Sequence, residues 1–327
     1  PPRSTLFPYT TLFRSKNMIG ISGISYHIPA QSIDNKEQAK KFNLSNEFLE
    51  KRIGVKNLPV KDSNQETSDL AIQAIMSLKK EYELNLDKIQ VIVVVTQNPD
   101  ARGLPHTSAI IHEKLSLKNN VAAFDISLGC SGYVYGLSII KGLMEEAGLT
   151  NGILVTCDPY SKIINRDSQD CTLLFGDASS ATLLSDNGDW TFGKPILSTD
   201  GTGHQNLYVG TDNKLKMNGR RIYNFAKIEV PKHIEQVLKN HNMNIDQVDL
   251  FCLHQGSKAI IEEISKNYPT VKNKFINDIW NTGNTVSSSI PILLKKHALE
   301  KKIKTVLICG FGVGLSWGSN ILINKKL

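Results

Sequence analysis

The sequence predicts an α/β protein in which one unit occurs twice, with mostly parallel strands and helices outside them. The first observation is an internal repeat, because NLDKIQVIVVVT at 85–96 aligns without gaps with NIDQVDLFCLHQ at 244–255. The second is the order strand–helix–strand–helix–strand, which occurs in each half and favours parallel pairing. No linker rich in Pro, Gly or Ser separates the halves, so we expect them to share one core.

Each half begins with an amphipathic helix and ends with a hairpin-like strand. The first half is expected to contain a helix at 70–82, the repeat strand, a buried strand at 121–126, a helix at 133–143, and the strands GILVTCDP and SSATLLSD. The second is expected to contain a helix at 230–241, the repeat strand, and the strands FINDIW, TVLICGFG and SNILINKK. This order predicts an N-terminal half at 18–189 and a C-terminal half at 190–327.

The first residues differ in character from the rest of the chain. Residues 5–15, TLFPYTTLFRS, read like the in-frame translation of a sequencing adapter. We therefore interpret residues 1–17 as a sequencing or cloning artefact and exclude them from the fold. The natural chain is expected to begin near Met18.

Composition narrows the function classes. The 327 residues are 40% hydrophobic and carry 38 basic against 31 acidic side chains, a net charge of +7. The lysines are scattered, which argues against a nucleic-acid partner, while a modest positive field would help an acidic protein to dock. Five cysteines form no CxxC pair and no metal-ligand spacing with histidine, so we expect a reduced, cytoplasmic protein without a metal. No apolar run reaches the length of a membrane span, and no signal peptide is apparent.

Cys130 is the first candidate catalytic residue. It lies where the strand predicted at 121–126 ends and a helix begins. Unpaired N–H groups and the positive end of the helix dipole favour a thiolate there, and the thiolate is the nucleophilic form. For a lone cysteine, packing in the core is the competing interpretation.

Two further polar residues occupy matching positions in the second half. His254 follows the apolar run LFCL directly, and Asn284 lies in NTGNTVSSSIP at another turn from strand to helix. Taken singly, His254 is explained by a structural histidine and Asn284 by a helix cap. Since ligands collect where strands end near a seam between halves, we expect Cys130, His254 and Asn284 to share a site.

Six motifs then carry a family resemblance across residues 18–327. They are GCSGYVYGLS around Cys130, LLFGDASSATLL at 173–184, MNGRRIYNFA at 217–226, LHQGSKAII at 253–261, GNTVSSSIP at 283–291 and GFGVGLSWGSNIL at 310–322. In content, order and spacing the chain resembles the β-ketoacyl-acyl-carrier-protein synthase III family of the thiolase superfamily. The resemblance implies thiolase-like α/β/α/β/α layers with mixed sheets.

The resemblance also implies a decarboxylative Claisen condensation in fatty-acid initiation or a specialised acyl or polyketide pathway. Cys130 would carry the acyl group of an acyl-CoA or acyl-carrier-protein donor, and His254 and Asn284 would donate hydrogen bonds to the carbonyl of a malonyl-carrier-protein-type extender. Backbone N–H groups of Cys130 and Val313 would form the oxyanion hole. No cofactor is implied, because coenzyme A and phosphopantetheine thioesters are substrates, and a homodimer that binds acyl carrier protein is expected.

Substrate-binding positions follow from the same resemblance. Arg52 matches an arginine that contacts coenzyme A, whereas Phe48 and Gln169 replace the tryptophan and arginine that hold its adenine. The remaining expected contacts are Met217, Asn218, Gly219, Phe225 and Ser257, and Leu104 would close the acyl pocket of the dimer partner. Ala259 replaces the arginine that docks the carrier protein, so Lys227, Lys232, Lys258 and Lys266 are expected to supply the docking face.

Other activities of the fold remain alternatives. An acyltransferase that esterifies a hydroxyl without decarboxylation is one, and a silent scaffold subunit of a ketosynthase heterodimer is another. A degradative thiolase needs a second catalytic cysteine in the late glycine loop, but Cys309 is one residue short of the matching position, Gly310, and would face the other side of a strand. A plant-type polyketide synthase shares the same three residues in a longer chain.

Overall fold

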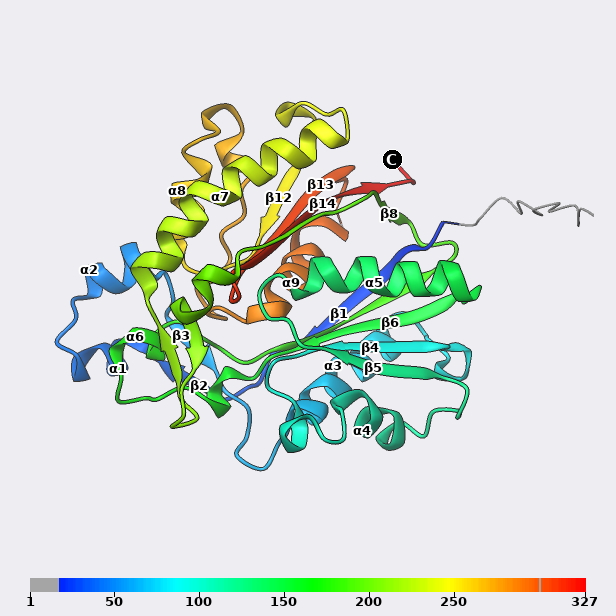
Figure 1. The fold of residues 1–327 in the computed structure, drawn as a ribbon, viewed down its shortest axis with the longest axis horizontal. Coiled ribbons are helices and arrows are strands. Elements are labelled where there is room, and N and C mark those ends of the chain that lie inside the picture. Colours follow the sequence, from blue (N-terminus) through cyan, green and yellow to red (C-terminus); the bar gives the residue numbers. More distant parts are fainter. Residues whose placement is uncertain (1–17, 300) are drawn as a thin grey trace, which may run out of the picture.

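A ten-stranded sheet links both halves of the chain (Figure 1). The computed structural model describes residues 18–299 and 301–327, so the predicted artefact at 1–17 lies outside the described residues. The strand order is β12-β13-β14-β8-β1-β7-β6-β4-β5, and β9 also pairs with β14. The sheet strands are β1 Gly20–His27, β4 Val91–Val95, β5 Ala122–Ile126, β6 Asn151–Cys157, β7 Ser179–Ser185, β8 Trp190–Phe192, β9 Ile196–Thr199, β12 Leu250–Leu253, β13 Thr305–Gly312 and β14 Ser316–Asn324.

Helices and two small hairpins surround this sheet. The helices are α1 Asn35–Lys41, α2 Asn46–Phe48, α3 Thr67–Glu81, α4 Thr107–Lys114, α5 Gly132–Ala147, α6 Gln169–Thr172, α7 Gly219–Asn240, α8 Lys258–Ser265 and α9 Ser289–Leu294. Short 3₁₀ or π turns are η1 Leu49–Ile53, η2 Leu86–Lys88, η3 Asp100–Gly103, η4 Tyr160–Lys162, η5 Gly201–Asn206, η6 Ile245–Gln247, η7 Pro269–Lys274, η8 Val286–Ser288 and η9 Lys295–Leu299. The hairpins pair β2 Ser32–Asp34 with β3 Asn57–Pro59, and β10 Leu207–Val209 with β11 Leu215–Met217.

The layers follow from where apolar side chains are buried. Helices α5 and α9 lie between the two halves of the sheet, and their side chains share one core with β1, β4, β12 and β13. Helices α3 and α4 cover the outer face of the first half, while α7 and α8 cover the outer face of the second (Figure 1). The predicted α/β/α/β/α layering is confirmed.

The sheet is mixed, but the expectation of mostly parallel pairing is wrong. Among the sheet strands of the described residues, only β4–β5, β4–β6 and β12–β13 pair in parallel. The other neighbours in the ten-stranded sheet are antiparallel. The cause is that β7 and β14 turn back on β6 and β13, and β1, β8 and β9 then pair with these reversed strands.

The internal repeat is present in space, with one element missing. The run β5–β4–β6–β7 has its counterpart in Phe275–β12–β13–β14, but Phe275 contributes only an isolated bridge to Phe251. The strand predicted at FINDIW stops there because the backbone N–H of Asp278 donates to the side chain of Gln255, which takes the place of a continued ladder. The boundary at 189/190, in the turn between β7 and β8, stays a prediction.

Strand β5 is less buried than its apolar sequence suggested. It is an edge strand that pairs with β4 alone. Ala122 is exposed, and the remaining residues of the strand are half-buried. The prediction of a fully buried strand at 121–126 is therefore wrong for this chain taken singly.

Candidate active site

Cys130 lies in the short connection from β5 to α5. The connection is tight because the N–H of Gly132 donates to the carbonyl of Gly129 at 2.8 Å. A side chain on Gly132 would collide with Val95, since its Cβ would lie 2.3 Å from the Val95 Cγ1. Glycine therefore lets the start of α5 rest directly on β4, and this places Cys130 just before the first turn of the helix.

The sulfur of Cys130 is buried, and this overrides the effect of the helix start. Burial raises the pKa of the Cys130 thiol to about 12, and the nearby carboxylate of Asp158 raises it further. The backbone N–H groups of Val313 and of Cys130 itself act in the opposite direction. The predicted thiolate is thus not the form present without substrate, and the thiol must lose its proton during the reaction.

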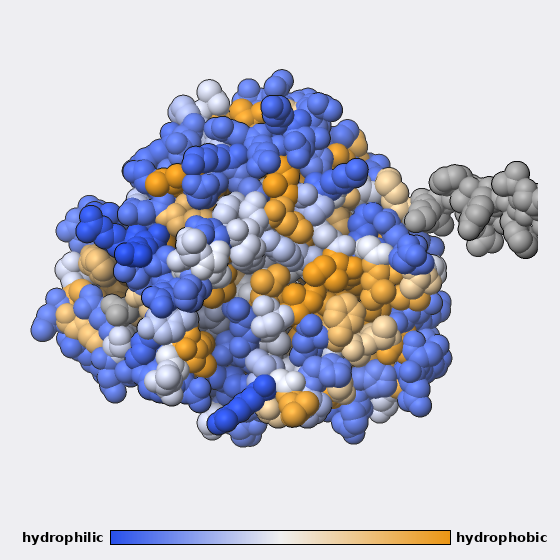
Figure 2. Space-filling view, viewed as in Figure 1, coloured by the Kyte–Doolittle hydropathy of each residue, from blue (hydrophilic) through white to orange (hydrophobic). Residues whose placement is uncertain are grey.

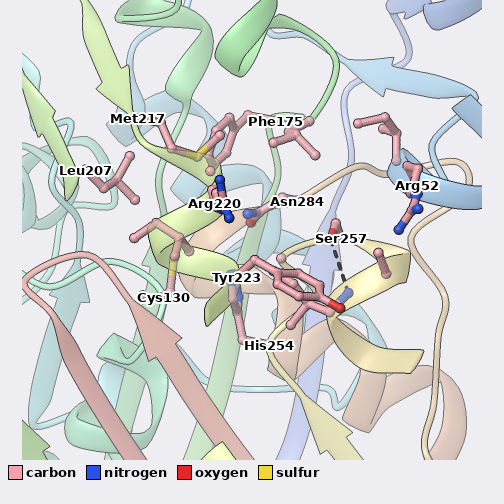
Figure 3. A pocket seen from close by; sticks show the side chains of 18 of the residues that line it. Arg52, Cys130, Phe175, Leu207, Met217, Arg220, Tyr223, His254, Ser257 and Asn284 are labelled. Carbon is pink, nitrogen blue, oxygen red and sulfur yellow. Dashed lines mark hydrogen bonds between the residues drawn. The ribbon is translucent and has the colours of Figure 1, made fainter. Parts of the chain in front are cut away.

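Cys130, His254 and Asn284 line one cavity of about 550 Å³ (Figure 3). Each side chain is buried. They come from three separate places in the chain: the β5–α5 connection, the end of β12 and the turn before η8. The structure therefore brings the three predicted residues together, from both halves of the repeat.

Asn284 is fixed so that its amide donates into the cavity. Its backbone N–H donates to the carbonyl of Leu174 at 2.8 Å, and its Oδ1 accepts the backbone N–H of Val286 at 2.9 Å. With the oxygen occupied, the NH₂ group is left for a substrate. The turn is strained, because the β-branched Val286 has φ of 52°.

His254 is a neutral histidine with a hydroxyl partner. Its backbone N–H donates to the carbonyl of Cys309 at 2.8 Å, and its ring Nδ1 lies 2.8 Å from the Oγ of Ser289. Burial lowers the pKa of His254 to about 3. The ring edge packs against Phe311 at a centroid distance of 5.5 Å. A neutral ring can offer one N–H or one lone pair to a substrate without adding charge.

The other residues that line the cavity are apolar in its interior and include basic side chains at its mouth. The apolar part is lined by Leu174, Phe175, Leu207, Met217, Ile222 and Phe311. Toward the mouth the lining includes Phe48, Arg52, Arg220, Tyr223, Ser257 and Ala259. Among the described residues, neither Arg52 nor Arg220 has an ion pair or a side-chain hydrogen bond. Two unpaired guanidinium groups beside an apolar tunnel suit a phosphate-bearing ligand with an acyl tail.

The predicted substrate-binding residues divide into two groups. Those that line the cavity are Phe48, Arg52, Met217, Gly219 and Ser257. Gln169, Asn218, Phe225, Val313 and Leu104 are not part of its lining. Gln169 is exposed, Asn218 caps α7 by accepting the N–H of Arg221, and Phe225 packs on Trp317 at 5.2 Å. Their predicted contacts with substrate stay predictions.

Several lining residues escaped the sequence analysis. Phe175 stands inside one quoted motif, LLFGDASSATLL, and Arg220 stands inside another, MNGRRIYNFA, but neither was assigned to the site. Asp158, which does not line the cavity but raises the pKa of Cys130, also escaped notice, although a polar residue directly after strand β6 is the signal that had pointed to His254. Leu174, Leu207 and Ile222 carry no such signal, since apolar residues look alike in a core and in a tunnel.

The lysines expected to dock a carrier protein are already paired. Lys227 and Lys266 both contact Glu263 at 2.7 Å. Lys232 contacts Glu229 at 2.9 Å, and Lys258 lies 3.9 Å from Glu262. These pairs reduce the free positive charge of the predicted docking face. By contrast, Arg52 and Arg220, which line the mouth of the cavity, are unpaired among the described residues.

Residues 18–299 and 301–327 contain neither a metal-binding cluster nor a membrane-spanning helix. No group of three or more His, Cys, Asp or Glu side chains in these ranges is arranged to hold a metal ion. Nor does any helix in them combine the length and the apolar character of a membrane span.

Known proteins resemble the chain over nearly its whole length. Profiles of 3-oxoacyl-[acyl-carrier-protein (ACP)] synthase III match residues 124–201, and those of its C-terminal part match residues 238–323. A β-ketoacyl-[acyl-carrier-protein] synthase III from Streptococcus mutans is 32% identical over 92% of this chain and 98% of that protein. The crystal structure of a 3-oxoacyl-(acyl-carrier protein) synthase from Burkholderia xenovorans is 28% identical, covers 94% of this chain and 95% of that chain, and has a TM-score of 0.87. A priming β-ketosynthase from the R1128 polyketide pathway shares the fold, with 22% identity over 94% of this chain and 96% of that one and a TM-score of 0.85.

Proposed function

The chain belongs to the β-ketoacyl-[acyl-carrier-protein] synthase III family, which makes it a condensing enzyme, and we propose that Cys130, His254 and Asn284 are its catalytic residues. The observation that carries the proposal is their convergence on one largely apolar cavity. Its substrates are an acyl thioester and a malonyl thioester on a carrier protein. The reaction joins them by decarboxylative condensation, in fatty-acid initiation or in a specialised acyl or polyketide pathway.

The first half-reaction is acyl transfer. The sulfur of Cys130 attacks the thioester carbonyl, the bond to the donor sulfur breaks, and the proton of Cys130 ends on the departing thiol. Charge builds on the carbonyl oxygen, and the N–H groups of Cys130 and Val313, which both stabilise negative charge at this sulfur, are the donors for it. The acyl chain then lies along the apolar part of the cavity.

The second half-reaction extends the chain by two carbons. The malonyl carboxylate leaves as carbon dioxide, and its electron pair moves onto the thioester carbonyl as an enolate. The amide of Asn284 and an N–H of His254 stabilise that oxygen without charge of their own. The enolate carbon attacks the acyl group, the bond to the sulfur of Cys130 breaks, and the departing thiolate takes up one proton from water.

The mouth of the cavity indicates how the thioester arm enters. Coenzyme A and phosphopantetheine both carry phosphate at the end of a long, uncharged arm. Arg52 on η1 and Arg220 on α7 are exposed, unpaired guanidinium groups beside the opening, and guanidinium binds phosphate well. We assign them to the phosphate end of the arm, with Phe48 and Tyr223 beside its uncharged part.

The uncovered face of the first half supports the proposal that the chain forms a homodimer. Edge strand β5 and helix α5 leave Ala122 and Ile139 exposed, and Phe124 is only partly covered. Figure 2 shows hydrophobic side chains gathered on this face. A second copy paired along β5 would bury this apolar face and complete the edge of the sheet.

Carbon dioxide release tests the proposal against its alternatives. The chain is incubated with a panel of acyl thioesters and ¹⁴C-carboxyl-labelled malonyl-carrier protein, and the acyl adduct on Cys130 is detected by intact mass. Condensation predicts an adduct, released carbon dioxide and a product two carbons longer. An adduct without release, even when the malonyl thioester is present, would favour simple acyl transfer to a hydroxyl. No adduct with any donor would favour a silent scaffold subunit.

A further inference from the structure

Three consecutive serines follow the catalytic asparagine turn, and each has a different partner. Ser287 donates to Asp158 Oδ2 at 2.5 Å. Ser288 donates to the carbonyl of Thr156 at 3.1 Å. Ser289 lies against the ring of His254, with its Oγ 2.8 Å from Nδ1. Two of the three therefore join the turn to the other half of the molecule, whereas Ser289 contacts the catalytic histidine.

The hydroxyl of Ser289 has two acceptors within reach and one proton. Besides Nδ1 of His254, the carbonyl oxygen of Val286 lies 3.0 Å from the Oγ. The carbonyl can only accept, and it also faces the ring of His254. Both Ser289 and His254 are buried. Within the described residues, no other side chain lies within hydrogen-bond distance of Nδ1.

The partner of Nδ1 decides what Nε2 presents to the substrate. A donor at Nδ1 leaves the ring proton on Nε2, so that Nε2 can donate to a carbonyl. An acceptor at Nδ1 draws the proton there instead, and Nε2 then holds a lone pair that repels a carbonyl oxygen. The carbonyl of Val286 is an acceptor, so the hydroxyl of Ser289 is the group that can supply a donor.

We propose that Ser289 is a positioning residue that donates to Nδ1 of His254 and so fixes the tautomer in which Nε2 carries the hydrogen. The inference rests on the proposed function, because an N–H on Nε2 is what decarboxylation requires of His254. Asn284 is prepared in a parallel way, since the N–H of Val286 occupies its oxygen and leaves its NH₂ free. One turn, Asn284 to Ser289, thus aims both donors at the same carbonyl.

Measuring the two half-reactions separately distinguishes this positioning role of Ser289 from a general structural role. Acyl transfer to Cys130 needs no N–H from His254, whereas the enolate does. In Ser289→Ala the hydroxyl is lost, and the carbonyl of Val286 is the acceptor that stays beside the ring of His254. We therefore expect the ring proton to move to Nδ1. We expect Cys130 acylation to stay within about threefold of wild type, and carbon dioxide release to fall about 10²- to 10³-fold, the loss usual for one transition-state donor.

The tautomer itself is read by NMR of the protein labelled with ¹⁵N-histidine, with the His254 signal assigned from a His254→Gln spectrum. Wild type is expected to show Nε2 protonated and Nδ1 unprotonated, and Ser289→Ala the reverse. Ser289→Thr, which keeps the hydroxyl, is expected to restore the wild-type tautomer and carbon dioxide release within about tenfold. Ser179→Ala is the matched control, since it removes a buried hydroxyl that donates to the carbonyl of Leu70 and lies outside the turn from Asn284 to Ser289, and it should leave the ratio of the two half-reactions unchanged.

The same experiments can overturn the inference. A wild-type spectrum with the proton on Nδ1, or a Ser289→Ala variant that keeps the wild-type tautomer, refutes it whatever the activity. Equal losses of acylation and carbon dioxide release in Ser289→Ala also refute it, because they indicate a general structural defect. If wild type itself releases no carbon dioxide, the proposed function fails, and the NMR result alone still decides the role of Ser289.

Discussion

Gly312 stands directly against Cys130. A Cβ built on Gly312 would lie 2.8 Å from the Sγ of Cys130 and 2.9 Å from its Cβ. Its neighbour Gly310 is equally close to the backbone, since a Cβ there would meet the carbonyl oxygen of Cys130 at 2.6 Å. The end of β13 can therefore approach the sulfur only because it carries no side chains at these two positions, and this approach brings the N–H of Val313 to the same sulfur.

Gly312→Ala is expected to slow acylation strongly while the protein stays folded. The added methyl group occupies the place of the attacking sulfur or forces it to rotate, so we expect acyl-Cys130 to form at least 100-fold more slowly. Intact mass against time measures this. Gly142→Ala is the matched control: Gly142 lies in α5 with nothing within 4 Å of a Cβ, and alanine there should stabilise the helix by about 0.5–1 kcal/mol with unchanged acylation. Normal acylation in Gly312→Ala would contradict the geometry.

Asp158→Asn is expected to make Cys130 more reactive. The carboxylate raises the pKa of the Cys130 thiol, and the amide removes its charge while its oxygen still accepts the N–H of Gln97. Alkylation of Cys130 by iodoacetamide at pH 8 should rise about three- to tenfold, because each pKa unit changes the thiolate fraction tenfold. Peptide mapping confirms the site. A slower reaction would show that Asp158 acts through packing rather than charge.

The same variant should change how stability depends on pH. Burial raises the pKa of Asp158 to about 6 from 3.8, so the folded state holds a proton that the unfolded state releases. Wild type then loses stability as the pH rises from 4 through 6, by up to about 3 kcal/mol for a difference of about two pKa units. Asp158→Asn lacks this loss, so its stability relative to wild type should increase from pH 4 to pH 7.5. Denaturant unfolding at both pH values measures it, and a constant difference would refute the assignment.

Glu263→Gln is expected to improve docking of an acidic carrier protein. Glu263 pairs with both Lys227 and Lys266, and the amide would release both ammonium groups. The KM for a carrier-protein substrate should fall several-fold at low salt, while the KM for a coenzyme A substrate stays unchanged. Glu229→Gln, which releases only Lys232, serves as the control. An equal effect on both substrates would mean that the change reaches the cavity rather than the docking face.

Leu104→Phe is expected to shorten the preferred acyl chain. Leu104 is 87% exposed and does not line the cavity of its own chain, which agrees with a position at a partner subunit. In the proposed homodimer, a bulkier side chain at Leu104 would reduce the space at the far end of the partner's acyl pocket. Acylation rates are compared across donors of increasing chain length, and sedimentation compares the oligomeric state of the variant with that of wild type. An unchanged preference would remove Leu104 from the pocket.

The sequence predicted that Cys130, His254 and Asn284 share a site, because each was expected to follow a strand near the seam between the halves. The structure brings the three side chains to one cavity, although the strand expected before Asn284 is reduced to an isolated bridge at Phe275. The form of the sulfur could not be predicted in the same way. A helix start is visible in the sequence, but the burial that raises the pKa of Cys130 comes from segments far along the chain.

The shape of the cavity could not be predicted from the sequence either. Leu174 and Leu207 face a tunnel, yet nothing in their sequence context separates them from core residues. Strand β5 presents a different problem. Its apolar sequence predicts that its side chains are buried, but the sequence does not say whether other parts of the same chain or a second copy would bury them. Single hydrogen bonds decide other details, such as the Gln255 side chain that ends the pairing after Phe275.

The serine contacts across the seam tie catalysis to the integrity of the whole molecule. Since Ser287 and Ser288 bind Asp158 and Thr156 on the opposite half, the turn that aims Asn284 cannot loosen while the halves stay joined. Heat should then remove activity and tertiary structure in a single cooperative step. We therefore expect no folded but inactive state to be populated on heating. The highest temperature at which the enzyme works is then set by global unfolding.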